Sequence, residues 1–108
     1  MHRDIKPENI LVNLGDFGEI KSLKLADFGL ACYFDDKSID RTVFGTPGYK
    51  APEGILGAHN IDEKVDSWSL GVVLYNCICG KMPFRGSEKK LDKNVLNKPP
   101  KFDERPWK

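Results

Sequence analysis

The stretch "HRDIKPEN", residues 2–9, places two acids, two cations, a histidine and an amide within eight positions. Asp4 and Asn9 stand five residues apart in a polar loop that leads into the apolar run Ile10-Leu11-Val12. Transfer of a phosphoryl group needs a carboxylate that orients a hydroxyl and accepts its proton, and it needs hard oxygen ligands for Mg²⁺. Asp4 suits the first task and Asn9 the second, while Lys6 would offset negative charge on a phosphate. An ordinary polar turn is the alternative interpretation.

The triplet Asp-Phe-Gly occurs twice downstream, at residues 16–18 and 27–29. Such a turn can present a carboxylate to a metal ion, but three residues are weak support by themselves. The run 23–25, "LKL", alternates apolar and polar residues as a half-buried strand does, and "NLGDFGEIKS" before it indicates a long hairpin connection. Asp16 is therefore expected at a loop tip, and Asp27 directly after the second strand.

The segment "KVDSWSLGVVLYNCICG", residues 64–80, carries the strongest helix pattern. Asp66 or Ser67 can cap its start and Gly80 ends it, so we expect a helix over residues 65–80. Apolar residues surround its circumference, which predicts burial on all sides. Residues 30–54 are expected to be irregular, because "GTPGY" and "AP" break any helix, and the chain from Pro83 onward is polar and turn-rich.

The composition fits a globular segment rather than a disordered one, with 40% hydrophobic and 31% charged residues among 108. A net charge of +1 argues against a nucleic-acid or membrane-surface role based on bulk charge. The densest basic region, Lys89 to Lys101, is diluted by Asp92, Asn94 and two prolines and is interpreted as solvated surface. Three cysteines without a spaced framework favour an intracellular, cytoplasmic location. No signal peptide and no bilayer-spanning stretch are expected.

Taken together, the motifs resemble the catalytic domain of eukaryotic protein kinases. "HRDIKPEN" is similar to the kinase catalytic loop H-R-D-L-x-x-x-N, with Ile5 at its fourth position. "ADFGLA" resembles the metal-binding turn, "GTPGYKAPE" the end of the activation segment and "DSWSLGVVLY" the buried central helix. The resemblance implies a partial, kinase-like α+β fold over residues 1–108, mainly C-terminal lobe. Its regions would be 1–13 (catalytic loop and first strand), 27–53 (activation segment) and 65–80 (central helix).

The resemblance also implies roles for single residues. Asp4 would be the catalytic base, and Lys6 would stabilise the transferred phosphate. Asn9 and Asp27 would hold Mg²⁺, which leaves the earlier Asp-Phe-Gly triplet as surface loop. Together with Lys6, Asn9 and Asp27, Leu11 would bind ATP, lying beneath the adenine.

Further residues would support or regulate this site. Arg3 resembles the arginine that binds a phosphate on the activation segment, and Thr42 the residue that carries the phosphate. Thr46 resembles the threonine that hydrogen-bonds the catalytic Asp and Lys. Asp66 resembles the aspartate that holds the backbone of the His-Arg-Asp turn, and Glu53 an acid that pairs with an arginine of a later helix. The remaining structural positions implied are His2, Phe28 and Gly29.

The sequence "KPEN" after Asp4 resembles serine/threonine rather than tyrosine kinases, which implies protein serine and threonine hydroxyls as acceptors. "GTPGYKAPE", "LYNCICGKMPF" and "KFDERPWK" look most like the calcium/calmodulin-dependent group, with regulation of that type. The 108 residues contain no Gly-rich loop or strand lysine of an N-terminal ATP lobe, and the last helices are absent too. We therefore expect these residues alone to be inactive. A truncated, non-catalytic kinase-like interaction module is the alternative.

Overall fold

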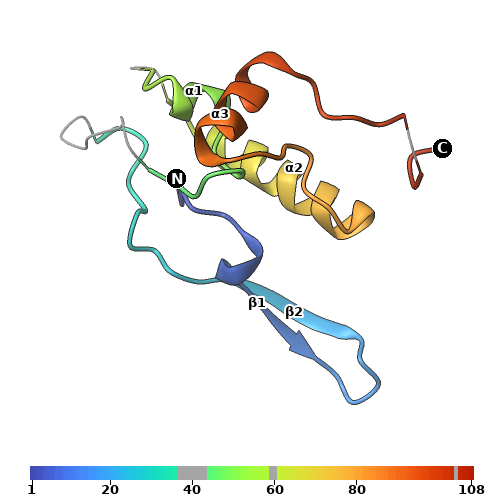
Figure 1. Ribbon diagram of the computed structural model, residues 1–108. Coiled ribbons are helices and arrows are strands. Elements are labelled where there is room, and N and C mark those ends of the chain that lie inside the picture. Colours follow the sequence, from blue (N-terminus) through green and yellow to red (C-terminus); the bar gives the residue numbers. More distant parts are fainter. Residues whose placement is uncertain (37–43, 59–60, 104) are drawn as a thin grey trace.

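The computed structural model describes residues 1–36, 44–58, 61–103 and 105–108. A β-hairpin projects from a group of helices, and a long segment follows the last helix (Figure 1). Within the described residues the α+β class expected from the sequence is present. In chain order the elements are η1 (a 3₁₀ turn, Pro7–Asn9), β1 (Ile10–Leu14), β2 (Ile20–Leu25), α1 (Pro52–Ile55), α2 (Lys64–Cys79) and α3 (Glu88–Asn97).

The hairpin is antiparallel and pairs Ile10 with Leu25 at its base. Both strands are longer than the sequence indicated, because pairing continues to Leu14 and Ile20 across an irregularity. The turn is therefore short, and the Gly15 N–H donates to the carbonyl of Glu19 at 2.8 Å. Five residues of β1 span about 16 Å. Asp16 lies beyond the end of this strand, so it is at least that far from the base of the hairpin, where Asn9 and Asp27 are found. The first Asp-Phe-Gly triplet thus occupies the tip (Figure 1).

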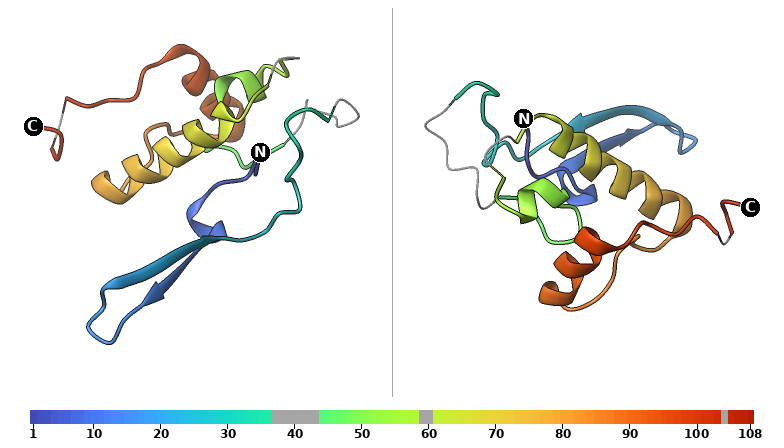
Figure 2. Two further views of the ribbon diagram at one scale, coloured as in Figure 1. Left: turned by 180° about the vertical axis from the view of Figure 1, so that it is seen from behind. Right: turned by 90° about the horizontal axis from the view of Figure 1, so that it is seen from above.

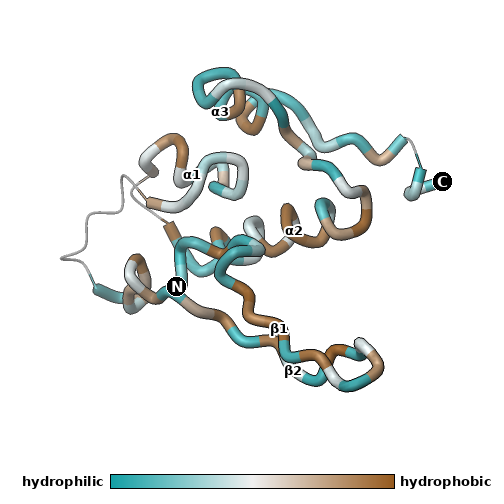
Figure 3. The backbone as a smooth tube through the Cα atoms, turned by 60° about the horizontal axis from the view of Figure 1, so that its bottom comes forward, coloured by the Kyte–Doolittle hydropathy of each residue, from teal (hydrophilic) through white to brown (hydrophobic). Residues whose placement is uncertain are grey.

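Both faces of the hairpin are open to solvent. The strands are coloured apolar along much of their length in Figure 3, and the hairpin projects clear of the helices in Figure 1. Surfaces of this kind are uncommon on soluble monomers. The exposed apolar side chains are Leu11, Val12, Leu14, Ile20, Leu23 and Leu25.

The core gathers segments that are distant in sequence. Phe44, Ala51, Ile61 and Val65 form a buried cluster, against which Met1, Ala58 and Trp68 pack. The cluster therefore joins the start of the chain, the end of the expected activation segment and the first turns of α2. Burial of these apolar side chains fixes the turn at residues 2–4 against the helices, since each large side chain contributes about 1.5–3 kcal/mol.

Glu63 is the N-cap of helix α2 but makes no side-chain capping hydrogen bond. Gly80 is the C-cap, with φ 66°. Asp66 lies inside the first turn rather than at the cap. The expected burial on all sides is wrong for this structure: Val65, Val72 and Val73 are buried, whereas a second stripe is open because no other element covers it in the part of the chain described. That stripe, spaced four residues apart, consists of Leu70, Leu74 and Ile78.

Two shorter helices depart from the sequence expectations. Pro52 does not break a helix but starts one, because proline at a first helical position loses no needed hydrogen bond. Helix α3 lies in the segment that was expected to be turn-rich. Its signals are Ser87 before the first turn, Glu88 within that turn, and the apolar pair Leu91 and Val95 four residues apart.

The molecule is more open than a typical domain of its length. Its radius of gyration is 15.2 Å, against about 13 Å for a compact chain of this size. Its accessible surface is 7590 Å², against about 6,100 Å² for a monomer of this mass. Figure 2 shows the hairpin and the C-terminal segment projecting in different directions. Among the described residues, no helix has the length and apolarity that a membrane span requires.

Candidate active site

The turn at residues 2–4 is held by a single carboxylate of α2. The backbone N–H groups of His2 and Arg3 donate to the two oxygens of Asp66, at 2.7 and 2.8 Å. Arg3 has φ 70°, a conformation that costs a non-glycine residue about 1–3 kcal/mol. Hydrogen bonds to a charged acceptor are strong enough to offset that strain. Asp66 therefore sets the backbone that carries Asp4.

The ring of His2 is buried and bonded at both nitrogens. Nε2 lies 3.0 Å from the carbonyl oxygen of Ala26, and Nδ1 lies 3.3 Å from the backbone nitrogen of Asp4. Because a backbone N–H must donate, Nδ1 accepts from Asp4, and Nε2 donates to the Ala26 carbonyl. The ring also meets Phe28 edge-on, with 5.0 Å between centroids. His2 thereby ties the loop to the end of β2.

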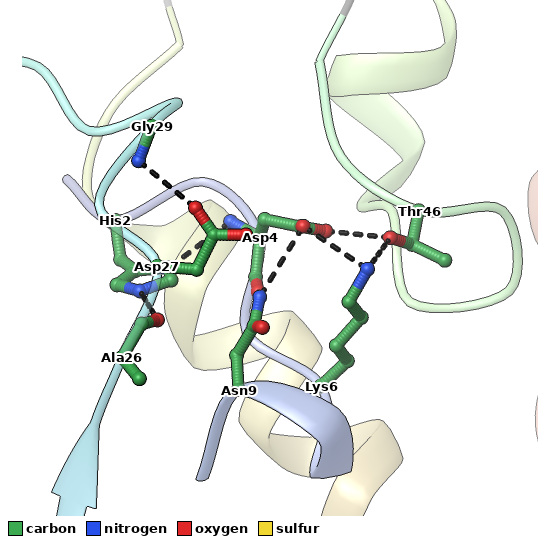
Figure 4. Close-up of polar contacts among 8 residues, drawn as sticks. All are labelled: His2, Asp4, Lys6, Asn9, Ala26, Asp27, Gly29 and Thr46. Carbon is green, nitrogen blue, oxygen red and sulfur yellow. Dashed lines mark hydrogen bonds and ion pairs between the residues drawn. The ribbon is translucent and has the colours of Figure 1, made fainter.

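Asp4, Lys6 and Thr46 form a closed hydrogen-bonded triangle (Figure 4). The Thr46 hydroxyl donates to Asp4 Oδ1 at 2.6 Å and accepts from Lys6 Nζ at 2.8 Å. Lys6 Nζ also lies 3.2 Å from Asp4 Oδ2. The triangle joins the loop before β1 to residues more than forty positions later. A charge-assisted network of this kind positions a carboxylate and an ammonium group side by side.

The surroundings of Asp4 keep its carboxylate ionised. Burial raises the pKa of Asp4, but the hydrogen bonds from Thr46, Lys6 and Asn9 and the charge of Lys6 together outweigh burial, so the net pKa lies below the usual 3.8. A carboxylate of low pKa is a weak base but a good hydrogen-bond acceptor. It can orient a hydroxyl group before it takes up a proton.

The base of the hairpin joins Asn9 to the residue before Asp27, because the Ala26 N–H donates to the Asn9 carbonyl at 2.9 Å. Asn9 Nδ2 donates to the backbone oxygen of Asp4 at 2.9 Å and to its Oδ2 at 3.3 Å, which leaves the amide oxygen to accept. Asp27 is exposed, with φ 59°, and its Oδ1 accepts from Gly29 N at 3.2 Å. An amide oxygen and a carboxylate fit Mg²⁺, which prefers hard oxygen ligands.

The other residues singled out from the sequence lie in different settings. Leu11 is 57% exposed on β1, where its side chain is free to contact a planar apolar ligand. Glu53 lies in the first turn of α1 and forms no ion pair within the described residues. Thr42 lies outside the described residues, so its pairing with Arg3 stays a prediction.

Arg3 has partners that sequence reasoning missed. Its Nε donates to the carbonyl of Leu30 at 2.5 Å, and its guanidinium lies over the ring of Phe44, 5.0 Å from the centroid. Neither contact has a sequence signal, since one uses a backbone carbonyl and the other an aromatic residue of the core. The Arg3 side chain thus spans the two ends of the segment between residues 30 and 44.

Comparison with known proteins agrees with this geometry. Residues 1–106 match the protein kinase domain family. A serine/threonine-protein kinase of Drosophila persimilis is 51% identical over 84 residues, 78% of this chain and 11% of that protein. A probable serine/threonine-protein kinase of Dictyostelium discoideum is 42% identical over 110 residues, 98% of this chain and 15% of that protein. The chain thus spans only a small part of these relatives. Since the family match covers nearly every residue, the chain belongs to the protein kinase family.

Proposed function

We propose that this chain forms part of a serine/threonine protein kinase, which transfers the γ-phosphate of ATP to protein hydroxyls. Residues 1–13 would supply the catalytic loop and first strand, residues 27–53 the activation segment, and residues 65–80 the central helix. The observation that carries the proposal is the triangle of Asp4, Lys6 and Thr46, with Asn9 bonded to Asp4 beside it. This arrangement presents a hydrogen-bond acceptor for a hydroxyl next to a cation for a phosphate.

Each side chain has a distinct role in the proposed reaction. The ionised Asp4 accepts the hydrogen bond of the substrate hydroxyl, aligns its oxygen for attack and takes its proton as the phosphate is transferred. Lys6 offsets the negative charge that develops on the transferred group. Thr46 holds the side chains of Lys6 and Asp4 in position relative to each other. When bound, ATP would supply the γ-phosphoryl group and leave as ADP, and Mg²⁺ would neutralise the charge on the phosphates. Asn9 and Asp27 would hold the metal, and Leu11 would contact the adenine.

The acceptor class and the regulation are also proposals. The Lys6-Pro7-Glu8-Asn9 sequence resembles serine/threonine kinases, and the relatives named above carry that description. The motifs "GTPGYKAPE" and "LYNCICGKMPF" support membership of the calcium/calmodulin-dependent group, with regulation of that type. Phosphorylation of Thr42 would add about −1.5 to −2 charges, which Arg3 could bind. We also propose an intracellular, cytoplasmic site of action, which three cysteines without a spaced framework support.

Residues 1–108 by themselves are expected to be inactive. They hold no Gly-rich loop and no lysine of the Val-Ala-Ile-Lys type, which cover the nucleotide and bind its phosphates in this family. Positioning of both reactants supplies about 7–11 kcal/mol of such catalysis. We expect this segment alone to bind Mg-ATP no tighter than millimolar and to transfer no phosphate.

Paired substitutions in the two Asp-Phe-Gly triplets test the proposed function. In the protein kinase that carries this chain, Asp27→Asn should abolish phosphate transfer, whereas Asp16→Asn should leave the rate within about threefold. The reason is that Asp27 directly follows Ala26, which is bonded to Asn9, whereas Asp16 lies at the far end of the hairpin. Transfer of radiolabelled phosphate to a serine/threonine peptide is the measurement, with Asp4→Asn as the inactive control. Comparable losses from both substitutions would overturn the metal assignment.

A non-catalytic interaction module is the second candidate, and the exposed apolar surface favours it. The hairpin and the open stripe of α2 offer apolar area of the kind that marks protein contacts. The same phosphate-transfer assay separates the two functions. A protein that binds a partner kinase but transfers no more phosphate than its Asp4→Asn variant would be an interaction module.

A further inference from the structure

A second cavity lies away from the candidate active site. It has a volume of about 350 Å³ and is formed by the end of α2, the α2–α3 link and the segment after α3. No residue lines both this cavity and the pocket around Asp4. Any ligand of the cavity would therefore bind independently of the phosphoryl-transfer site.

The cavity is strongly basic. Among its described lining residues there is no Asp or Glu. Residues 81–108 contain nine Lys and Arg and four Asp and Glu. Residues 1–80 contain eight Lys and Arg and twelve Asp and Glu, so the C-terminal part of the chain is basic although the net charge of the whole chain is only +1. Like charges around one small cavity repel one another, and a bound anion relieves that repulsion. The cationic lining residues are Lys81, Arg85, Lys98, Lys101 and Arg105. Lys81 has a further interaction of its own, so the other four cations make the anion site.

Hydrogen bonds fix the backbone at three of these cations. Asn94 Nδ2 donates to the carbonyl of Arg85 at 2.8 Å, and the carbonyl of Asn94 accepts from Lys98 N at 3.0 Å. The Tyr75 hydroxyl donates to the carbonyl of Lys101 at 2.8 Å. The backbone that carries these three cations is therefore held in place on two segments, the α2–α3 link and the segment after α3. A backbone held in this way has less entropy to lose on binding than a free loop.

The remaining walls of the cavity are apolar and contain one donor without an acceptor. Tyr75, Phe84 and Trp107 line the cavity together with Met82. Trp107 Nε1 is buried and has no hydrogen-bond partner among the described residues. A buried N–H without an acceptor is costly, and a ligand with acceptor oxygens could satisfy it. The cavity thus suits a ligand that joins an anionic group to apolar groups.

We propose that this cavity binds a phosphorylated serine or threonine side chain of a protein segment whose neighbouring residues are apolar. A phosphate monoester carries about −1.5 to −2 charges and three strong acceptor oxygens, so it offers more charge and more acceptor atoms to several cations than one carboxylate does. Arg85 and Arg105 supply the forked donors that suit phosphate oxygens. The apolar walls favour a peptide over a bare headgroup or nucleic-acid backbone.

Binding of a labelled phosphopeptide tests this proposal. The probe is a fluorescein-labelled peptide with one phosphoserine between leucines, and its unphosphorylated form is the ligand control. In fluorescence anisotropy, Arg85→Gln with Lys101→Gln should weaken binding by about tenfold or more. Lys89→Gln with Lys90→Gln on α3 removes the same charge outside the cavity and should change affinity by less than about twofold. Circular dichroism verifies the fold of each variant.

Protection of lysines in the wild-type chain gives a second readout that requires no variant to fold. With acetic anhydride and mass spectrometry, the phosphopeptide should protect Lys98 and Lys101 but not Lys89 and Lys90 from acetylation. Equal binding of both peptides, equal losses in both double variants, or no protection would overturn the proposal. Binding of inositol hexakisphosphate or anionic vesicles without binding of the peptide would also overturn it, in favour of a headgroup site.

Discussion

Thr46 joins the two charged side chains of the candidate active site without carrying a charge itself. Thr46→Val keeps the volume but removes the hydroxyl that Asp4 and Lys6 share. Loss of hydrogen bonds to charged groups costs about 1.5–3 kcal/mol each, so we expect kcat to fall by about 10- to 100-fold. Steady-state phosphate transfer by the kinase that carries this chain is the measurement. Thr46→Ser, which keeps the hydroxyl, should stay within about threefold, and equal losses in Val and Ser would contradict the role of the hydroxyl.

Asp4 should also give the chain an acid-sensitive stability. Its pKa in the folded chain lies below the usual 3.8, so the folded state stays ionised at pH values where the unfolded state takes up a proton. The contribution of Asp4 to the free energy of unfolding is complete above the unfolded pKa and is lost as pH falls through the folded pKa. Urea unfolding of wild type and Asp4→Asn from about pH 6 to about pH 2 should show a difference that shrinks only in acid. A difference independent of pH would contradict this.

Much of the candidate site could be proposed from sequence because its residues lie in short, ordered motifs. Asp4, Lys6 and Asn9 fall within six positions, and the resemblance pointed to Thr46 and Asp27. The contacts of Arg3 with Leu30 and Phe44 could not be foreseen. They join positions that only the folded backbone brings together, and no spacing rule encodes them.

The helices show where periodicity is informative and where it is not. Residues 64–79 carry enough apolar residues to indicate α2, but a helix that is apolar all round cannot indicate which face the chain covers. Helix α3 is hard to predict for the opposite reason: it has too few apolar residues to show a clear period, since Leu91 and Val95 are its main apolar pair among charged residues. The strands were underestimated because Asn13 and Ser22 look like loop residues but are paired.

Replacement by alanine should have opposite effects on stability at Gly71, inside α2, and at Gly80, its C-cap. At both Gly71 and Gly80 a Cβ would meet no atom within 4 Å, so only the backbone decides. Gly80 has φ 66°, where alanine is strained, whereas Gly71 is inside the helix, where alanine restricts the unfolded chain. Gly80→Ala should destabilise by about 1–2 kcal/mol, and Gly71→Ala should stabilise by about 0.5–1 kcal/mol. Urea unfolding measures both, and shifts of the same sign would contradict the explanation.

Because the molecule is open, much of its apolar surface lies in solvent. The stripe of Leu70, Leu74 and Ile78 on α2 and the two faces of the hairpin lie in solvent. Each large side chain left in water forfeits about 1.5–3 kcal/mol. Three or four such residues match the net stability of a typical domain, about 5–15 kcal/mol. Residues 1–108 alone should therefore be marginally stable or bury this surface by association.

Substitution of the α2 stripe tests whether that surface drives association. In light scattering after size exclusion, residues 1–108 should elute above monomer mass, and the triple change Leu70→Gln, Leu74→Lys and Ile78→Gln should shift them to monomer. Leu14→Gln with Ile20→Gln on the hairpin is the matched control, and it should shift the mass less. A monomeric wild-type chain, or a larger effect of the hairpin pair, would contradict this assignment.

The two bonds from Asp66 to the turn at His2 and Arg3 also bear on the order of folding. They close loops of 64 and 63 residues, more than half the chain. Closing a long loop costs entropy before any contact repays it, so such contacts form late, after the local hairpin and α2. We therefore expect the turn at residues 2–4 to assemble near the end of folding and to be among the first regions to open when the chain begins to unfold. A partly unfolded population would keep its secondary structure while the carboxylate of Asp4 is already out of place.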